Sequence, residues 1–290
     1  MERAAGRLID RRGALAGLGA LAAASTGAGA FATETAAPAR LVQGGFAFGR
    51  TKPRAPISVD GQTLGVTSRS GLYLVGFDRD APATTVFGAY VGGQWRTRTE
   101  TIAPVSYDIQ HVDGLPPETV TPTKPDIIAR IAAERVKKVA AAESRDDSED
   151  FKDGFILPLD HPIRTSPFGV QRVLNGEPKP PHYGLDLAAP QGTPIHAPAP
   201  GLVVLAEPDL FLEGGLVMID HGQGLISFYL HQSRVVAKAG ERVRRGEVIG
   251  EVGMKGRATG PHLCWRLGWR GRHMDPSLLI GAAAPATLTG

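Results

Sequence analysis

Glycine and proline interrupt this chain at short intervals, which limits the secondary structure it can form. The 290 residues include 37 glycines and 23 prolines, and only 6% are aromatic. From Phe155 onward, short apolar runs alternate with tight turns, and no strand–helix–strand alternation is present. A doubly wound parallel sheet is therefore disfavoured. The sequence predicts a mainly β protein whose C-terminal part is an antiparallel sheet.

Two groups of strands are expected. In the N-terminal part, apolar runs between turns predict strands at residues 41–48, 57–59, 72–77 and 85–91, which would form a small β-sandwich used for packing or binding. The C-terminal group predicts the antiparallel sheet, with strands at residues 201–206, 216–220, 225–230, 247–252 and 262–267.

A helix and a linker are predicted to join the two groups. Residues 114–125 contain four prolines and predict an extended connection. Pro125 and Asp126 then begin a helix, because proline and an acid both suit the first turn. Ile128, Ala132, Val136 and Val139 fall on one face of it. The acid-rich residues 144–153 end the helix in a predicted solvated linker.

The first thirty residues have the features of a secretory signal. Four arginines, ending with Arg11 and Arg12, precede the uncharged residues 13–30, and small residues before position 31 offer a cleavage site. Arg11 and Arg12 resemble a twin-arginine export signal. A membrane span is the weaker interpretation because the run is only mildly apolar; a basic, disordered terminus is the other alternative.

The charge argues against a nucleic-acid-binding protein, and the cysteine content excludes a fold held by intrachain disulfides. The net charge of +3 is too small, and the basic residues too dispersed, for a nucleic-acid-binding protein. The single cysteine, Cys264, cannot form an intrachain disulfide.

Two even spacings bring potential metal ligands together. His182 and Asp186 are four residues apart, so they share one face of an extended chain, and Gly184 between them leaves that face open. His262 and Cys264 share a face two residues apart. Histidine, aspartate and cysteine all bind zinc, and three protein ligands plus water form a catalytic site. The alternative for Cys264 is a buried, small apolar residue.

Three motifs carry a resemblance to a known family. Residues 182–186 read His-x-Gly-x-Asp, residues 229–231 read Tyr-x-His, and residues 256–262 read Gly-x-x-Thr-Gly-Pro-His. In this order they resemble the lysostaphin-type (LytM-domain) zinc endopeptidases of bacterial cell walls. The N-terminal β segment is similar to the domain that precedes the peptidase in a periplasmic subgroup of that family.

The resemblance implies a role for five residues. His182 and Asp186 correspond to zinc ligands, and Cys264 stands where the family has its third ligand, a histidine. His231 and His262 correspond to the unliganded pair that acts as general base and as stabiliser of the oxyanion. A thiolate in place of an imidazole adds a negative charge to the ligand set, which weakens zinc as a Lewis acid.

We therefore expect a zinc metalloendopeptidase that cuts stem or cross-link peptides of peptidoglycan. The expected organisation is a signal peptide (1–30), an N-terminal β domain (41–122), a helix and acidic linker (123–150) and a LytM-type metallopeptidase domain (151–280). Export to the periplasm of a diderm bacterium is expected, with no membrane span in the mature form. The rival function is an inactive LytM domain that activates cell-wall amidases, with amidases or divisome components as partners.

Overall fold

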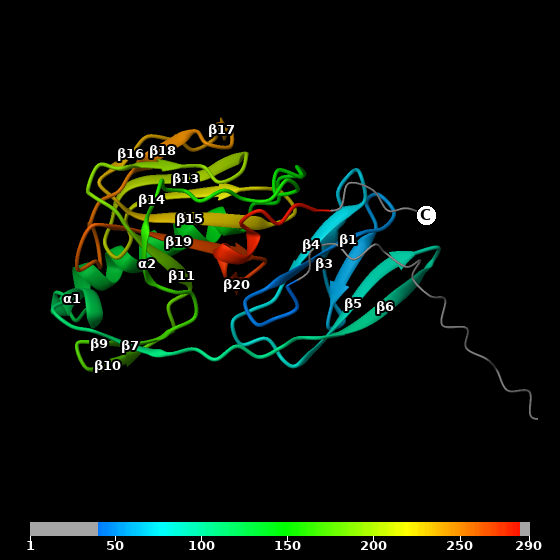
Figure 1. The fold of residues 1–290 in the computed structure, drawn as a ribbon, viewed down its shortest axis with the longest axis horizontal. Helices are drawn as coiled ribbons and strands as arrows, with labels where there is room; N and C mark the ends of the chain where they lie inside the picture. The colour runs from blue at the N-terminus through cyan, green and yellow to red at the C-terminus, as the bar shows by residue number, and fades with distance from the viewer. Residues whose placement is uncertain (1–39, 285–290) are drawn as a thin grey trace, which may run out of the picture. The chain divides into compact units, whose positions relative to one another are not determined.

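The computed structural model describes residues 40–284, which are mainly β-strand as the turn-rich sequence predicted (Figure 1). The predicted signal at residues 1–30 lies outside the described residues. Within residues 40–284, no helix combines the length and the apolar character needed to cross a membrane. The domain boundaries expected from the sequence stay predictions.

The largest sheet holds eight strands, and every pair in it is antiparallel. In spatial order these are β17 (Arg242–Val243), β13 (Gly201–Leu210), β14 (Gly214–Asp220), β15 (Leu225–Gln232), β19 (His262–Trp269), β11 (Gly184–Ala188) and β8 (Ile163–Ser166), with β20 (Arg272–Met274) paired to β19. Figure 1 shows β13, β14, β15 and β19 side by side. Four of the five strands predicted for the C-terminal part lie in this sheet.

The fifth predicted strand belongs to a separate small sheet. β18 (Val248–Glu251) lies between β12 (Pro194–His196) and β16 (Arg234–Val235). Both of its neighbours are only two or three residues long, which is too short for a periodic apolar pattern to reveal them.

Strand β19 separates the core from the opposite face of the sheet. Leu263, Trp265 and Leu267 are at most 1% exposed and lie in the main apolar core, as their alternation predicted. Cys264 lies among a different group of buried residues, which includes Leu230. The strand therefore presents its odd-numbered residues to the core and its even-numbered residues to the other face.

The N-terminal part consists of two small sheets. One pairs β1 (Phe46–Arg50) with β4 (Leu72–Gly76); the other contains β2 (Pro56–Val59), β3 (Gln62–Val66), β5 (Thr84–Val91) and β6 (Gln94–Thr101). Phe77 and Phe87 stack with ring centroids 5.8 Å apart. Their apolar cluster is continuous with that of the large sheet, so one core serves both parts of the chain.

The proline-rich connection is more structured than predicted. It contains the short helix α1 (Pro117–Val120), and the strand β7 (Ile109–Val112) just before it pairs in parallel with β9 (Gln171–Leu174), which pairs with β10 (Glu177–Lys179). This pairing attaches residues 109–120 to the C-terminal part of the chain, where they reach the site described below.

Helix α2 (Pro125–Ala142) begins at the predicted proline, but its apolar face is not in the core. Ile128, Val136 and Val139 are about half exposed or more, at 49%, 69% and 49%. Polar side chains anchor the helix instead. Lys137 pairs with Glu207 of β13 at 2.8 Å, and buried Glu134 accepts a hydrogen bond at 3.0 Å from the backbone N–H of Phe211, the residue after β13.

The acid-rich segment is anchored, and the prediction of a solvated linker was wrong. Asp146 pairs with Arg242 of the C-terminal part at 2.7 Å, whereas Asp147 accepts hydrogen bonds from Arg54 and Arg69 of the N-terminal part. Phe151 is fully buried against Phe48, with ring centroids 5.7 Å apart. Arginine partners distant in sequence neutralise the acids, and a local charge count cannot reveal such partners.

Candidate metal centre and pocket

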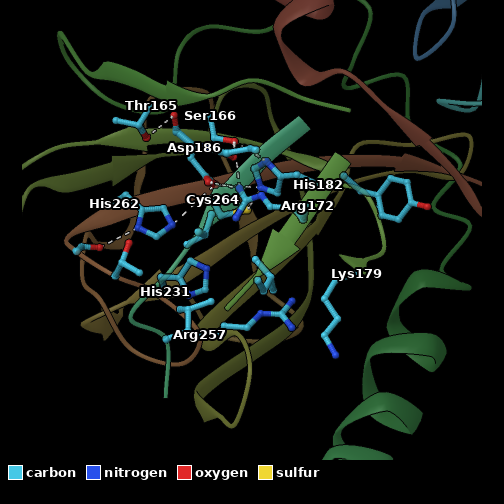
Figure 2. A pocket seen from close by; sticks show the side chains of 18 of the residues that line it. Thr165, Ser166, Arg172, Lys179, His182, Asp186, His231, Arg257, His262 and Cys264 are labelled. Atoms are coloured by element: carbon cyan, nitrogen blue, oxygen red, sulfur yellow. Dashed lines mark hydrogen bonds and ion pairs between the residues drawn. The ribbon is translucent and has the colours of Figure 1, made fainter. Parts of the chain in front are cut away.

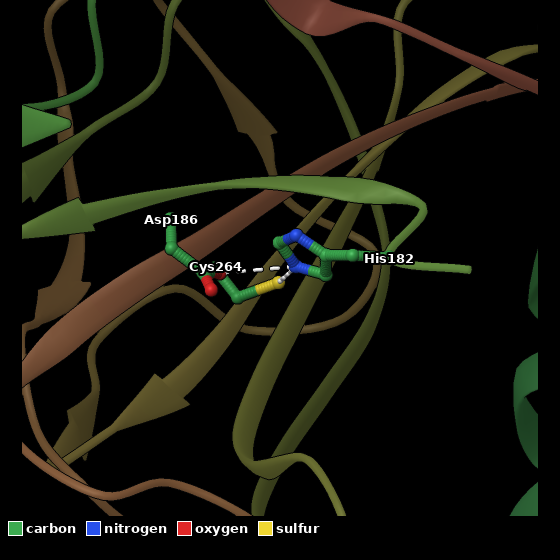
Figure 3. A group of neighbouring side chains, drawn as sticks. All are labelled: His182, Asp186 and Cys264. Carbon is green, nitrogen blue, oxygen red and sulfur yellow. Dashed lines mark hydrogen bonds and ion pairs between the residues drawn. The ribbon is translucent and has the colours of Figure 1, made fainter. Parts of the chain in front are cut away.

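Strand pairing brings two of the predicted ligands face to face. In the antiparallel pair of β11 and β19, Asp186 is directly opposite Cys264. Directly paired residues project to the same face of a sheet. His182 precedes β11, and its ring turns back toward both side chains (Figure 3).

The three candidate ligands converge within the dimensions of a metal site. Their donor atoms all lie within 4.8 Å of one another. His182 Nε2 is 3.1 Å from Asp186 Oδ1 and 3.3 Å from Cys264 Sγ. The three residues are 7%, 8% and 1% exposed. Cys264 is thus both buried, as the apolar alternative required, and directed at the other two donors.

Two further observations indicate that a cation fits among these donors. Asp186 Oδ1 is buried and, among the described residues, accepts no hydrogen bond of acceptable geometry even from His182 Nε2 at 3.1 Å, although a buried carboxylate oxygen ordinarily accepts one. A Cβ atom at Gly184 would lie 2.9 Å from Cys264 Sγ and 3.2 Å from His182 Nε2. The glycine therefore preserves the space between the ligands, and imidazole, carboxylate and thiolate are zinc donors.

Burial and neighbouring charges set the protonation states of the three groups. Burial opposes ionisation of Asp186, but His182 and its other basic neighbours outweigh burial and hold its pKa well below the usual range. Burial lowers the pKa of His182, so the ring is neutral at pH 7. Burial raises the pKa of the Cys264 thiol to about 12. A metal ion must therefore displace one proton, from sulfur.

Polar side chains around the donors fix their orientation. Arg172 donates to Asp186 Oδ2 at 2.8 Å, which leaves Oδ1 for a metal. Ser166 Oγ lies 3.3 Å from His182 Nδ1 and donates to Gln110 Oε1 at 2.7 Å. When a neighbouring group binds one ring nitrogen of a histidine, the other ring nitrogen is oriented toward the metal. Here Ser166 binds Nδ1, and Nε2 is the candidate ligand atom. Gln110 belongs to β7, so the N-terminal connection contributes to this shell.

His231 and His262 lie beside the donors without joining them. Their ring centroids are 4.7 Å apart, and His262 Nε2 is 3.8 Å from Asp186 Oδ1. Each Nδ1 lies 2.8 Å from a backbone carbonyl, of Lys255 for His231 and of Gly260 for His262. A carbonyl only accepts hydrogen bonds, so Nδ1 carries the proton and Nε2 is free to accept one.

His231 is held in an unusual environment. Its φ is 66°, in the left-handed region that non-glycine residues rarely adopt, and such strain is concentrated at functional sites. Burial, followed by the nearby His262, lowers the pKa of His231 to about 3. The ring is therefore neutral at physiological pH.

All five side chains line one cavity of about 480 Å³ (Figure 2). Its wall also includes four basic residues, Arg172, Lys179, Arg257 and Arg266, against the single carboxylate of Asp186. The sequence analysis missed these basic residues. Arg257 lies inside the third motif and Arg266 shares the face of Cys264 on β19, so both could have been proposed as lining residues; Arg172 and Lys179 come from strands without a sequence signal.

Comparison with known proteins agrees with this geometry. Residues 180–276 match the model of peptidase family M23. A crystal structure of a Pseudomonas aeruginosa protein assigned to peptidase M23 is 30% identical, covers 83% of this chain and 95% of its own, and superposes with a TM-score of 0.65. The chain belongs to peptidase family M23. The family resemblance inferred from the three motifs is thereby confirmed.

Two curated M23 relatives carry more specific names. The peptidoglycan DD-endopeptidase ShyA of Vibrio cholerae is 44% identical over 33% of this chain and 22% of its own length. The DD-carboxypeptidase/endopeptidase Mpg of Neisseria meningitidis is 40% identical over 43% of this chain and 29% of its own length. The chain thus matches less than a third of either relative, in the part that contains the candidate centre.

Proposed function

We propose that this M23 protein is a zinc metalloendopeptidase that hydrolyses peptide bonds in peptidoglycan. The observation that carries the proposal is the convergence of His182, Asp186 and Cys264 around the space kept open by Gly184. The names of the curated relatives support the substrate class. Export to the periplasm through the signal at residues 1–30 is part of the same proposal.

His182 Nε2, Asp186 Oδ1 and Cys264 Sγ would hold the zinc ion. Bound zinc polarises a carbonyl group and lowers the pKa of a water molecule. The free Nε2 of His262, on the exposed side of the pair, accepts the proton of the attacking water. His231, more deeply buried, faces the same space; because its Nδ1 proton is held by the Lys255 carbonyl, it would stabilise charge on the carbonyl oxygen only with a second proton on Nε2. Arg172 and Ser166 keep Asp186 and His182 in place.

The test compares variants of the two histidines with the wild type. His231→Ala and His262→Ala should each retain zinc, measured by elemental analysis, because neither residue is among the three converging donors. Release of peptides from isolated peptidoglycan should fall by roughly 10²–10⁴-fold, the effect of losing an acid–base group. His196→Ala, outside the cavity lining, is the matched control. Loss of zinc from His262→Ala would instead make His262 a ligand.

A second function, activation of a cell-wall amidase without catalysis, is favoured by one observation. Arg266 Nε lies 3.4 Å from Cys264 Sγ, so it competes with a metal ion for the sulfur. If this function is correct, metal-free protein should activate a purified amidase as well as zinc-loaded protein does, and peptidoglycan should remain uncut by the M23 protein alone. Zinc-dependent release of peptides would exclude this alternative.

A further inference from the structure

Arg257 is a cation in the pocket that makes no ion pair, although the charge of the Glu213 carboxylate acts on it. None of the ion pairs among residues 40–284 includes it. Its side chain makes one long hydrogen bond, from Nη1 to the Thr119 carbonyl at 3.4 Å. That distance exceeds the usual N–H···O range of about 2.7–3.2 Å. Most of the five N–H donors of this partly buried guanidinium therefore lack a protein partner.

The other basic residues of the pocket are already engaged. Arg172 donates to Asp186, Arg266 to Cys264, and Lys179 lies 2.8 Å from Glu177 Oε2. Burial, followed by the positive charge of Arg266, lowers the pKa of Arg257 from its ordinary value. Burial therefore disfavours the charge of Arg257, while its unbonded N–H groups stay accessible from the pocket and can receive an incoming anion.

Arg257 lies where a bound substrate could contact it. The residue belongs to the loop that leads into His262, and the Thr119 carbonyl it contacts belongs to α1 on the wall contributed by the N-terminal connection. Figure 2 shows Arg257 and Lys179 on the side of the pocket opposite Thr165 and Ser166, with the candidate ligands between. A substrate spanning the centre would thus reach Arg257.

We infer that Arg257 binds a free carboxylate of the substrate close to the bond that is cut. Guanidinium and carboxylate form paired, charge-assisted hydrogen bonds, and this geometry suits arginine better than lysine. The inference rests on the proposed peptidase function and narrows its substrate class to anionic peptides. Neutral or amidated peptides would lose this interaction.

The test measures binding, so that it does not depend on turnover. The probes are acetyl-L-Lys-D-Ala-D-Ala with a free carboxylate and the same peptide as its C-terminal amide, titrated by calorimetry into zinc-loaded His262→Ala protein. We expect the acid to bind about 10–100-fold more tightly than the amide, as a charge-assisted pair implies. Adding Arg257→Gln should remove this preference by weakening the acid alone, whereas Arg257→Lys should restore part of it.

Two controls separate substrate binding from a structural role. Arg244→Gln, whose side chain is 91% exposed outside the pocket, should leave the preference intact. The Tm of Arg257→Gln should equal or exceed that of the wild type, because an unfavourable charge is removed; a lower Tm would indicate a structural role and overturn the inference. Equal binding of acid and amide by the parent protein, or a preference that survives Arg257→Gln, would also overturn it. Failure of the peptidase proposal would show separately, as wild-type protein that binds zinc and the acid peptide without cutting peptidoglycan.

Discussion

Replacing Gly184 with alanine tests the metal centre with a single added carbon atom. The new Cβ would lie 2.8 Å from Arg266 Cγ and 2.9 Å from Cys264 Sγ, whereas ordinary contacts begin at 3.4 Å. The sulfur or its strand must therefore move by about half an ångström. Zinc–ligand distances tolerate only about ±0.2 Å. The substitution should displace a donor without removing any ligand.

The magnitude follows from this displacement. Disturbing the support of a metal ligand typically costs about 10–100-fold in affinity, and we expect the upper end for Gly184→Ala. At a zinc concentration 100 times the wild-type Kd, stabilisation by the metal is about 2.7 kcal/mol; with a 100-fold weaker site it falls to about 0.4 kcal/mol. For a protein of this size, the difference corresponds to a loss of roughly 5–9 °C in the zinc-induced rise in Tm.

The assay is thermal unfolding with and without zinc, together with competition against a chromogenic chelator. Using the zinc-induced shift, rather than Tm itself, removes the overpacking cost of about 1–3 kcal/mol that any crowded substitution brings. Gly268→Ala on β19 is the matched control, because its Cβ would meet nothing closer than 3.5 Å. Wild-type zinc affinity in a folded Gly184→Ala protein would refute the assignment of this space to a metal.

Three further predictions concern protons and packing. Zinc affinity should rise about tenfold per pH unit between pH 6 and 8, because the raised pKa of Cys264 makes the metal displace one proton; a pH-independent Kd measured by chelator competition would contradict thiolate ligation. Burial lowers the pKa of His221 to about 4, so the unfolded chain takes up a proton that the folded protein excludes, and stability should fall as the pH drops from 6.5 to 4 by at most about 3 kcal/mol. Urea unfolding of His221→Gln should show a weaker pH dependence than that of His111→Gln, an exposed control. Phe151→Ala, which removes a fully buried ring stacked on Phe48, should cost about 3–5 kcal/mol, and a loss below 1 kcal/mol in the same assay would contradict the anchored position of the acid-rich segment.

The sequence predicted the elements whose signals are local. Alternation in residues 262–267 identified both the core face and the site face of β19, because a strand's side chains alternate strictly. Pro125 marked the start of α2, since proline suits the first turn of a helix. Strand β6 was missed because all but one of its side chains are polar, and β3 because its two apolar side chains, Leu64 and Val66, are too few and too exposed to form a pattern.

Features that depend on partners distant in sequence were not predictable. The five candidate site residues were named from motifs, and the structure brings them together around one cavity, while their chemical roles stay predictions. That Arg257 makes no ion pair becomes visible only when the neighbouring carboxylates, such as Glu213, have been located. The exposed face of α2 has the same explanation: amphipathic spacing identifies a helix, but which face packs depends on where β13 offers contacts.

Because β7 pairs with β9, the pocket is lined by residues from two separate segments of the chain. The segment matched by the M23 family, residues 180–276, contains all five candidate site residues. The lining also includes Gln110, Leu115 and Arg172, which precede that segment. A chimera that transferred only residues 180–276 into another protein would therefore carry the reactive centre without its own flank. Exchanging residues 109–120 alone would therefore change one part of the pocket wall while leaving Arg257 and the five candidate site residues in place.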